Sequence, residues 1–183
     1  DPEFDIFRSI GIDSEKLYSP ESLQQQRNLK YFRKLEPLPE TAEEARLIAN
    51  ALGEGDLMLK NNASETMVKN IDLSKYKYIL FATHGVMANE FPGINEPGVV
   101  LTPPINSDKL NDGILTASEI AKLKLNADLV LLSACNTAAT DGTLDAEGLS
   151  GLAKSFFYAG ARNLLVSHWA VFSDSTVKIT TTI

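Results

Sequence analysis

The chain has 183 residues, of which 44% are hydrophobic and 22% are charged, a composition typical of one soluble globular domain. Its formal net charge of −7 argues against binding to nucleic acid or to anionic membrane surfaces, both of which attract basic proteins. No apolar run approaches the ~20 residues that span a bilayer, no signal-peptide pattern opens the chain, and the single cysteine cannot form an internal disulfide. We therefore expect a cytoplasmic protein.

The first residues of the chain differ in character from the rest. Residues 1–4 are interpreted as a cloning remnant that does not belong to the fold. Residues 5–37 are polar and irregular, and we expect an N-terminal extension or linker there. Pro37 and Pro39 mark the entrance to the compact domain, which is predicted to occupy residues 38–183.

The first helix of the compact domain is predicted to begin at Thr41. Thr41 and Glu44 have the spacing of a capping box, in which two side chains satisfy the free amides at the start of a helix. Apolar side chains then recur on one helical face, and Gly53 ends the pattern. This face consists of Ala45, Ile48, Ala49 and Leu52.

Helices and strands then alternate. A short strand is predicted at residues 57–59, followed by a helix that Ser64 caps. The inward side chains of this helix are Met67, Val68 and Ile71. Residues 78–82 form a continuous apolar run of β-forming residues, which is typical of a strand buried on both faces.

The second half of the chain continues this alternation. Residues 91–113 are rich in proline and glycine and predict a loop excursion with a hairpin at residues 99–101. The remaining predicted elements are a short helix after Thr116, buried strands at 129–132 and 164–166, and between these strands an amphipathic helix from Gly148 to Gly160. The apolar face of that helix consists of Leu149, Leu152, Ala153, Phe156 and Phe157.

Helices that alternate with buried strands predict an α/β fold. The expected architecture is a three-layer αβα sandwich with a mostly parallel central sheet and right-handed crossovers. In such sheets, ligands and reactive groups gather at the carboxyl ends of the strands.

Two reactive side chains follow predicted strands at that end of the sheet. His84 comes two residues after strand 78–82, and Cys135 comes three residues after strand 129–132. If these strands are neighbours, a thiol and an imidazole share one edge, as nucleophilic acyl transfer requires. The spacing also agrees with caspase-type enzymes, in which the histidine comes ~50 residues before the cysteine. Because Gly85 has no side chain, we expect its amide and that of Cys135 to hold an oxyanion.

Five ordered blocks of the sequence resemble the CHAT domain, a caspase-like peptidase module. The two signature blocks are Ala-Thr-His-Gly at 82–85 and Leu-Leu-Ser-Ala-Cys-Asn-Thr at 131–137. The later blocks lie at 147–149, 159–162 and 169–174. The resemblance extends over about residues 38–174, which is most of the chain.

This resemblance implies a caspase-like fold in which His84 and Cys135 form a catalytic dyad that cleaves protein substrates. Some members act within bacterial phage-defence systems. Family members typically follow helical repeats similar to tetratricopeptide repeats, so we expect a regulatory repeat region or an activating partner. The family pattern normally continues past the block at 169–174, and the domain is therefore expected to be truncated at its C-terminus.

Acidic side chains follow the cysteine closely at Asp141, Asp145 and Glu147. The simplest interpretation is a solvated acidic loop. Alternatively, Asp145 or Glu147 lines the specificity pocket and pairs with a substrate arginine or lysine, so that cleavage occurs after a basic residue. Oxygen-bearing side chains alternate here as calcium ligands can, but the loop does not match an EF-hand. Trp169 is either a core residue or a wall of the substrate groove.

Other activities lack their sequence signals. The chain has no phosphate-binding loop, hydrolase elbow or dinucleotide fingerprint. Two histidines and one cysteine are too few for a closed zinc site, so we expect no metal and no cofactor. We therefore expect a cysteine endopeptidase. The alternative is a catalytically silent caspase-like module for signalling or protein interaction.

Overall fold

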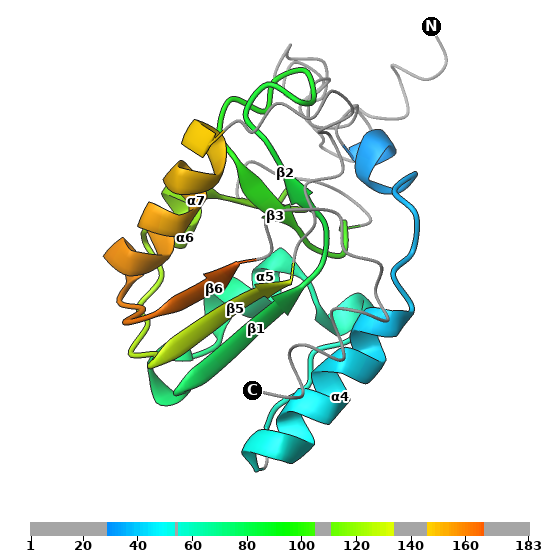
Figure 1. Ribbon diagram of the computed structural model, residues 1–183. Coiled ribbons are helices and arrows are strands. Elements are labelled where there is room, and N and C mark those ends of the chain that lie inside the picture. The colour runs from blue at the N-terminus through cyan, green and yellow to red at the C-terminus, as the bar shows by residue number, and fades with distance from the viewer. Residues whose placement is uncertain (1–28, 54, 105–110, 134–145, 167–183) are drawn as a thin grey trace, which may run out of the picture.

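The computed structural model describes residues 29–53, 55–104, 111–133 and 146–166, with side chains in the last range described from Gly151 onward. The chain folds into a central parallel sheet with helices on both sides and a second, smaller sheet (Figure 1). This architecture is the α/β fold that the sequence predicts.

The central sheet consists of three parallel strands in the order β1-β5-β6. These strands are β1 (Tyr78–Ala82), β5 (Leu129–Ser133) and β6 (Leu164–Val166), and they confirm the three predicted strands. The register of the first pair aligns Ala82 with Ser133. The two strands therefore end side by side at the carboxyl edge of the sheet.

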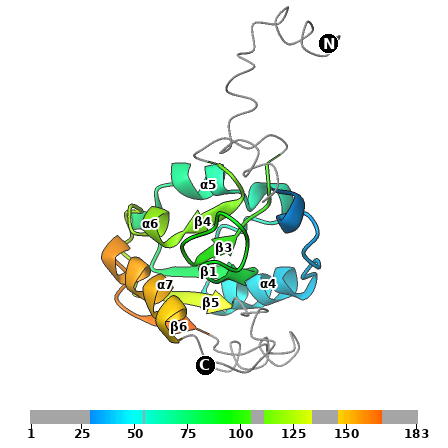
Figure 2. The ribbon, with the colours of Figure 1, turned by 90° about the horizontal axis from the view of Figure 1, so that it is seen from above.

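Helices cover both faces of this sheet (Figures 1 and 2). On one face lies α4 (Glu40–Leu52), which packs against β1. The other face is covered by α5 (Glu65–Asn70), α6 (Ala117–Ile120) and α7 (Ala146–Ala159). Two short 3-10 helices, η1 (Lys60–Asn62) and η2 (Leu73–Lys75), flank α5. The predicted three-layer arrangement is thus present in the described part of the chain.

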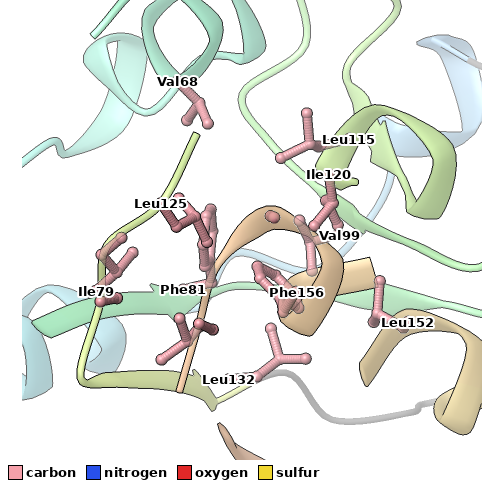
Figure 3. Close-up of a cluster of buried hydrophobic side chains, with 14 of the residues drawn as sticks. Val68, Ile79, Phe81, Val99, Leu115, Ile120, Leu125, Leu132, Leu152 and Phe156 are labelled. Carbon is pink, nitrogen blue, oxygen red and sulfur yellow. The ribbon is translucent and has the colours of Figure 1, made fainter. Parts of the chain in front are cut away.

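The main hydrophobic core lies between the sheet and the second helical layer. Ile79 and Phe81 point into this core, and the ring of Phe81 lies 5.5 Å from the ring of Phe156 on α7. Figure 3 shows side chains from all three helices of that layer converging on the sheet. They include Val68, Ile120, Leu152 and Phe156. Because side chains alternate along a strand, Ala82 and Ser133 face the opposite layer, which contains α4.

The loop excursion forms a small antiparallel sheet in the order β2-β3-β4. Its strands are β2 (Gly85–Val86), β3 (Gly98–Val100) and β4 (Ile114–Thr116), which confirms the predicted hairpin in this region. A second apolar cluster packs between this sheet and residues 29–35. Its buried members are Phe32, Val86, Ile94, Val100 and Ile114.

The start of α4 differs from the prediction. Pro39 occupies the N-cap position, and the hydroxyl of Thr41 donates to the carbonyl of Leu38 at 2.7 Å instead of capping the helix. The predicted capping box is therefore wrong, and the side chain of Glu44 is buried on the inner face of α4 instead. Gly53 does end the helix, with a φ of 103° that favours glycine. Leu52 is 50% exposed and does not lie on the buried face.

The other predicted caps are present. Ser64 caps α5 by accepting from the amide of Met67 at 3.4 Å, and Thr116 caps α6 in a complete capping box with Glu119. Gly160 follows α7 with a φ of 113°. These turns follow directly from local sequence.

Some predicted burial is absent. Residues 57–59 form no strand and instead line a cavity beside β1. Three side chains predicted to be inward or buried are exposed instead, since each lies on the outer side of its element. These are Met67, Phe157 and Leu165.

Candidate active site

The carboxyl ends of β1 and β5 bring together the residues that follow them. The amide of Thr83 donates to the carbonyl of Ser133 at 3.2 Å, so the pairing of the two strands continues one residue past β1. His84 is the next residue along this chain. Cys135 comes two positions after Ser133 and lies outside the described residues.

The imidazole of His84 has a defined partner. Its Nε2 lies 2.8 Å from the backbone carbonyl of Glu36. A carbonyl oxygen only accepts hydrogen bonds, so Nε2 carries the proton in this contact. In the neutral ring, Nδ1 is then the unprotonated nitrogen that can accept a proton. The contact with Glu36 therefore selects one tautomer of the histidine.

The backbone around His84 is anchored to the small sheet. The amide of Val100 donates to the carbonyl of His84 at 2.8 Å, and the hydroxyl of Thr83 donates to the carbonyl of Val100. These bonds join the end of a central strand to β3. The position of the histidine therefore depends on both sheets.

Gly85 begins β2 opposite Val99 of β3. Its neighbours His84 and Val86 occupy the hydrogen-bonded positions of this antiparallel pair, so Gly85 occupies a non-hydrogen-bonded position between them. Its N–H therefore points away from β3. In the described pairing with β3, this amide therefore has no partner on that strand and lies next to His84 in the chain.

Glu44 is a site residue that sequence analysis missed. Its side chain is only 3% exposed, and its Oε2 accepts a hydrogen bond from the hydroxyl of Ser133 at 3.2 Å. The sequence contains a signal for this position, because Glu44 is one turn before Ile48 on the buried face of α4. The capping-box interpretation instead assigns Glu44 to the start of the helix.

Residues 29–44 connect three parts of the site, and we call this segment the N-terminal strap. Phe32 packs in the apolar cluster of the small sheet, Glu36 contacts His84, and Glu44 contacts Ser133. The guanidinium of Arg33 also donates to the carbonyl of Pro104 at 2.7 Å. The strap therefore holds the residues that follow β1 and the last residue of β5 at once.

A cavity of about 820 Å³ lies between α4 and the open edge of β1, and His84 lies on its wall. Most of its other walls are apolar, with side chains from the strap, from residues 57–59 and from β1. Asp56 also lies on the wall, but the hydroxyl of Tyr76 donates to it at 2.5 Å. Glu36 also lies on the wall, so this cavity is mostly apolar with two acidic residues at its surface.

The remaining predicted site residues are not placed by the structure. Cys135, Asp145 and Trp169 lie outside the described residues, and Glu147 lies in the first turn of α7 with only its backbone described. The predicted alternating acidic segment at 141–147 is likewise not described except for the start of this helix. Among the described residues, no group of three or more potential metal ligands occurs.

A separate charged cluster joins α5 to the small sheet and α6. The ammonium of Lys69 lies 2.5 Å from Oε1 of Glu65 and 2.7 Å from Oε1 of Glu119. The other oxygen of Glu65 accepts from the amide of Gly113 at 3.0 Å. These contacts satisfy a carboxyl group that is only 2% exposed.

The pKa values in this cluster reflect burial and hydrogen bonding. Burial raises the pKa of the Glu65 carboxyl from 4.5 to about 7, although hydrogen bonds from Lys69 and Gly113 oppose the rise. Burial lowers the pKa of the Lys69 ammonium, but hydrogen bonds to Glu119 and Glu65 outweigh it and raise that pKa above its ordinary value. The cluster therefore keeps the cation and holds a proton on Glu65 up to near neutral pH.

The parallel sheet, the helical layers and the histidine at a strand end define a caspase-like α/β domain. A family comparison identifies the CHAT domain over residues 14–183, and the chain belongs to this family. CHAT domains are related to caspase-like cysteine peptidases. Searches of curated proteins and of solved structures returned no match. No helix in the described ranges has the length and apolar character needed to cross a bilayer.

Proposed function

We propose that this domain is a cysteine endopeptidase that uses His84 and Cys135 as a dyad. The observation that carries the proposal is the His84 ring, fixed at the end of a strand whose register places it beside the end of β5. Cys135 follows that end by two residues, and two residues span at most ~7 Å of extended chain. The proposal requires the thiol to lie near the edge that holds the imidazole.

The dyad supports a two-step hydrolysis. The thiol of Cys135 gives its proton to Nδ1 of His84, and the sulfur attacks the scissile carbonyl. The imidazolium then protonates the departing amine as the C–N bond breaks. Water, deprotonated by the same nitrogen, hydrolyses the thioester and restores the thiol. The carbonyl of Glu36 keeps Nδ1 available throughout, because it holds the proton on Nε2.

The amide of Gly85 is suited to bind the developing oxyanion. It points away from β3, and it directly follows the histidine. Together with the amide of Cys135, it would supply two donors to the tetrahedral intermediate. One such donor is worth on the order of 10²-fold to 10³-fold in rate.

Substrate selection is assigned to the residues after the thiol. We propose that Asp145 or Glu147 pairs with a basic side chain of a protein substrate and that Trp169 borders the groove. The cavity beside His84 is mostly apolar, although Glu36 and Asp56 also line it. Adjoining helical repeats or a protein partner would regulate the domain, and a cytoplasmic location fits this role.

Mapping of new N-termini tests the proposal. The 183-residue chain is incubated with a peptide library made from a bacterial proteome, in parallel with Cys135→Ala and with the surface variant Lys122→Gln. We expect cleavage by the wild type and by Lys122→Gln, and a loss of at least ~10³-fold in Cys135→Ala. Unchanged cleavage by Cys135→Ala would exclude the assigned nucleophile.

The same data test specificity separately. Enrichment of arginine or lysine before the cut supports the acidic pocket, and Glu147→Gln and Asp145→Asn then identify its carboxylate. Cleavage without such enrichment removes the pocket assignment and leaves the dyad intact. If no peptide is cut and Cys135 reacts with iodoacetamide like an ordinary thiol, the domain is a silent interaction module.

A further inference from the structure

The Glu44 carboxyl group occupies an unusual place for an acidic side chain. It lies on the buried face of α4, only 3% exposed, at the carboxyl edge of the central sheet. Burial of a carboxyl group is costly, and each one needs hydrogen-bond donors in return. One such donor is the hydroxyl of Ser133 at 3.2 Å.

Ser133 is the last residue of β5, and the chain that carries Cys135 begins there. Its carbonyl accepts from Thr83, and its hydroxyl donates to Glu44. The backbone and the side chain of Ser133 are therefore fixed from two directions. One bond leads to the strand that carries His84, and the other leads to α4.

We propose that Glu44 is a positioning residue for the dyad, acting through Ser133. Its carboxyl group fixes the end of β5 relative to α4, and thus the point from which the nucleophile is presented to His84. This inference rests on the proposed function. Because the strap also supplies the Glu36 carbonyl, one segment contacts both the imidazole of His84 and the last residue of β5.

Substitutions separate this role from simple folding. Glu44→Ala removes the acceptor, Ser133→Ala removes the donor, and Glu44→Gln keeps an amide oxygen that can still accept from Ser133. The matched control is Glu43→Ala, one residue away on the exposed side of α4, where Glu43 forms only a 3.7 Å surface pair with Arg46. Each variant is first compared with the wild type by thermal unfolding.

Kinetics give the first readout, with the best peptide from the library as substrate. We expect Glu44→Ala and Ser133→Ala each to lower kcat by ~10-fold to 100-fold, with KM changed by less than ~3-fold, because a misplacement of about 1 Å has this effect. The double variant should be no worse than the poorer single variant, and Glu44→Gln should recover most of the rate. Additive losses in the double variant would overturn the proposal.

Alkylation of the thiol gives a second readout that needs no substrate. The chain has one cysteine, so the rate of reaction with iodoacetamide reports on Cys135 alone. A thiol paired with an imidazole reacts with a pH midpoint below the ordinary value of ~8.5. We expect Glu44→Ala to move the midpoint toward ~8.5 and Glu43→Ala to leave it unchanged.

The outcomes distinguish this inference from the proposed function. If the wild-type midpoint is low and folded Glu44→Ala retains it, the positioning role is wrong and the dyad stands. If the wild type itself has an ordinary midpoint and Cys135→Ala still cleaves peptides, the proposed dyad is wrong.

Discussion

Two buried glutamates lie in different regions of this domain, and their surroundings differ. Glu65 is 2% exposed and contacts an ammonium group and a backbone amide, in a cluster that joins α5 to β4 and α6. Glu44 is 3% exposed and contacts the hydroxyl of Ser133 at the carboxyl edge of the sheet. The two carboxyl groups are thus buried to a similar extent, but the donors named here differ: an ammonium and a backbone amide for Glu65, and a hydroxyl for Glu44.

The difference indicates two kinds of role. The Glu65 cluster connects elements that form the frame of the domain, so its loss should reduce stability. The Glu44 contact connects α4 to the end of β5, two residues before Cys135, so under the proposed function its loss should reduce turnover. We therefore expect substitutions in the Glu65 cluster to change stability and substitutions at the candidate site to change activity.

The largest expected effect is on activity. His84→Ala should lower peptide cleavage by on the order of 10³-fold, because it removes the acid and base of the reaction. Its hydrogen bond to Glu36 is exposed, so unfolding by urea should change by less than about 1 kcal/mol. A loss of stability large enough to explain the lost activity would contradict the assigned role.

Lys69→Met should have the opposite pattern. It removes the cation that Glu65 and Glu119 share, and we expect a loss of about 3 kcal/mol in the free energy of unfolding at pH 8. At pH 5 the loss should be smaller, because Glu65 is then protonated. Denaturant titration measures both values. Cleavage per folded molecule should stay near the wild-type rate. A large fall in kcat would contradict the expectation that the Glu65 cluster affects stability and not turnover.

The pH dependence of stability should reveal Glu65 itself. Its pKa in the folded chain is about 7, against 4.5 ordinarily, so the folded state holds the proton more tightly than the unfolded state. This contribution to stability is complete below pH ~4.5 and is lost as the pH rises to about 7. A rise of this size corresponds to about 3 kcal/mol.

Glu65→Gln provides the control, since the amide does not titrate. The stability difference between wild type and Glu65→Gln should therefore shift between pH 4.5 and 7 and stay constant above that range. Asp112, whose pKa burial also raises, remains in both chains and cancels. A difference that does not vary with pH would show that folding does not raise the pKa of Glu65.

The smallest effect is expected at the surface. Asp128 pairs with Arg162 and lies 4.0 Å from Lys77, and all three side chains are largely solvated. Asp128→Asn should change the free energy of unfolding by less than about 1 kcal/mol and leave cleavage unchanged. A larger loss would mean that solvent-exposed pairs contribute to the frame as much as the Lys69 cluster does.

The sequence predicts the frame well where signals are local or strongly periodic. The apolar runs at β1 and β5, the caps at Ser64 and Thr116 and the glycine stops need no long-range information. The predicted strand at 57–59 is wrong because a strand forms only when it pairs with another strand, and a short apolar run does not encode that pairing.

The candidate site is only partly readable from sequence. His84 and Gly85 are recognisable from their place after a strand, and the structure describes both. The carbonyl of Glu36 is not recognisable, since every residue has one and only the path of the chain selects it. The sequence pattern assigns Glu44 to a local cap, because Ser133, which donates to it in the structure, is remote in the sequence.

The N-terminal strap gives the domain a mechanical property. It is anchored by Phe32 on the small sheet, and it then meets the imidazole and the last hydroxyl of β5 in succession. A protein partner that displaces the end of the strap near Phe32 would shift two polar contacts together. These are the contact of Glu36 with His84 and the contact of Glu44 with Ser133. In the proposed dyad, such a displacement would change the alignment of His84 and Cys135 without a ligand in the cavity.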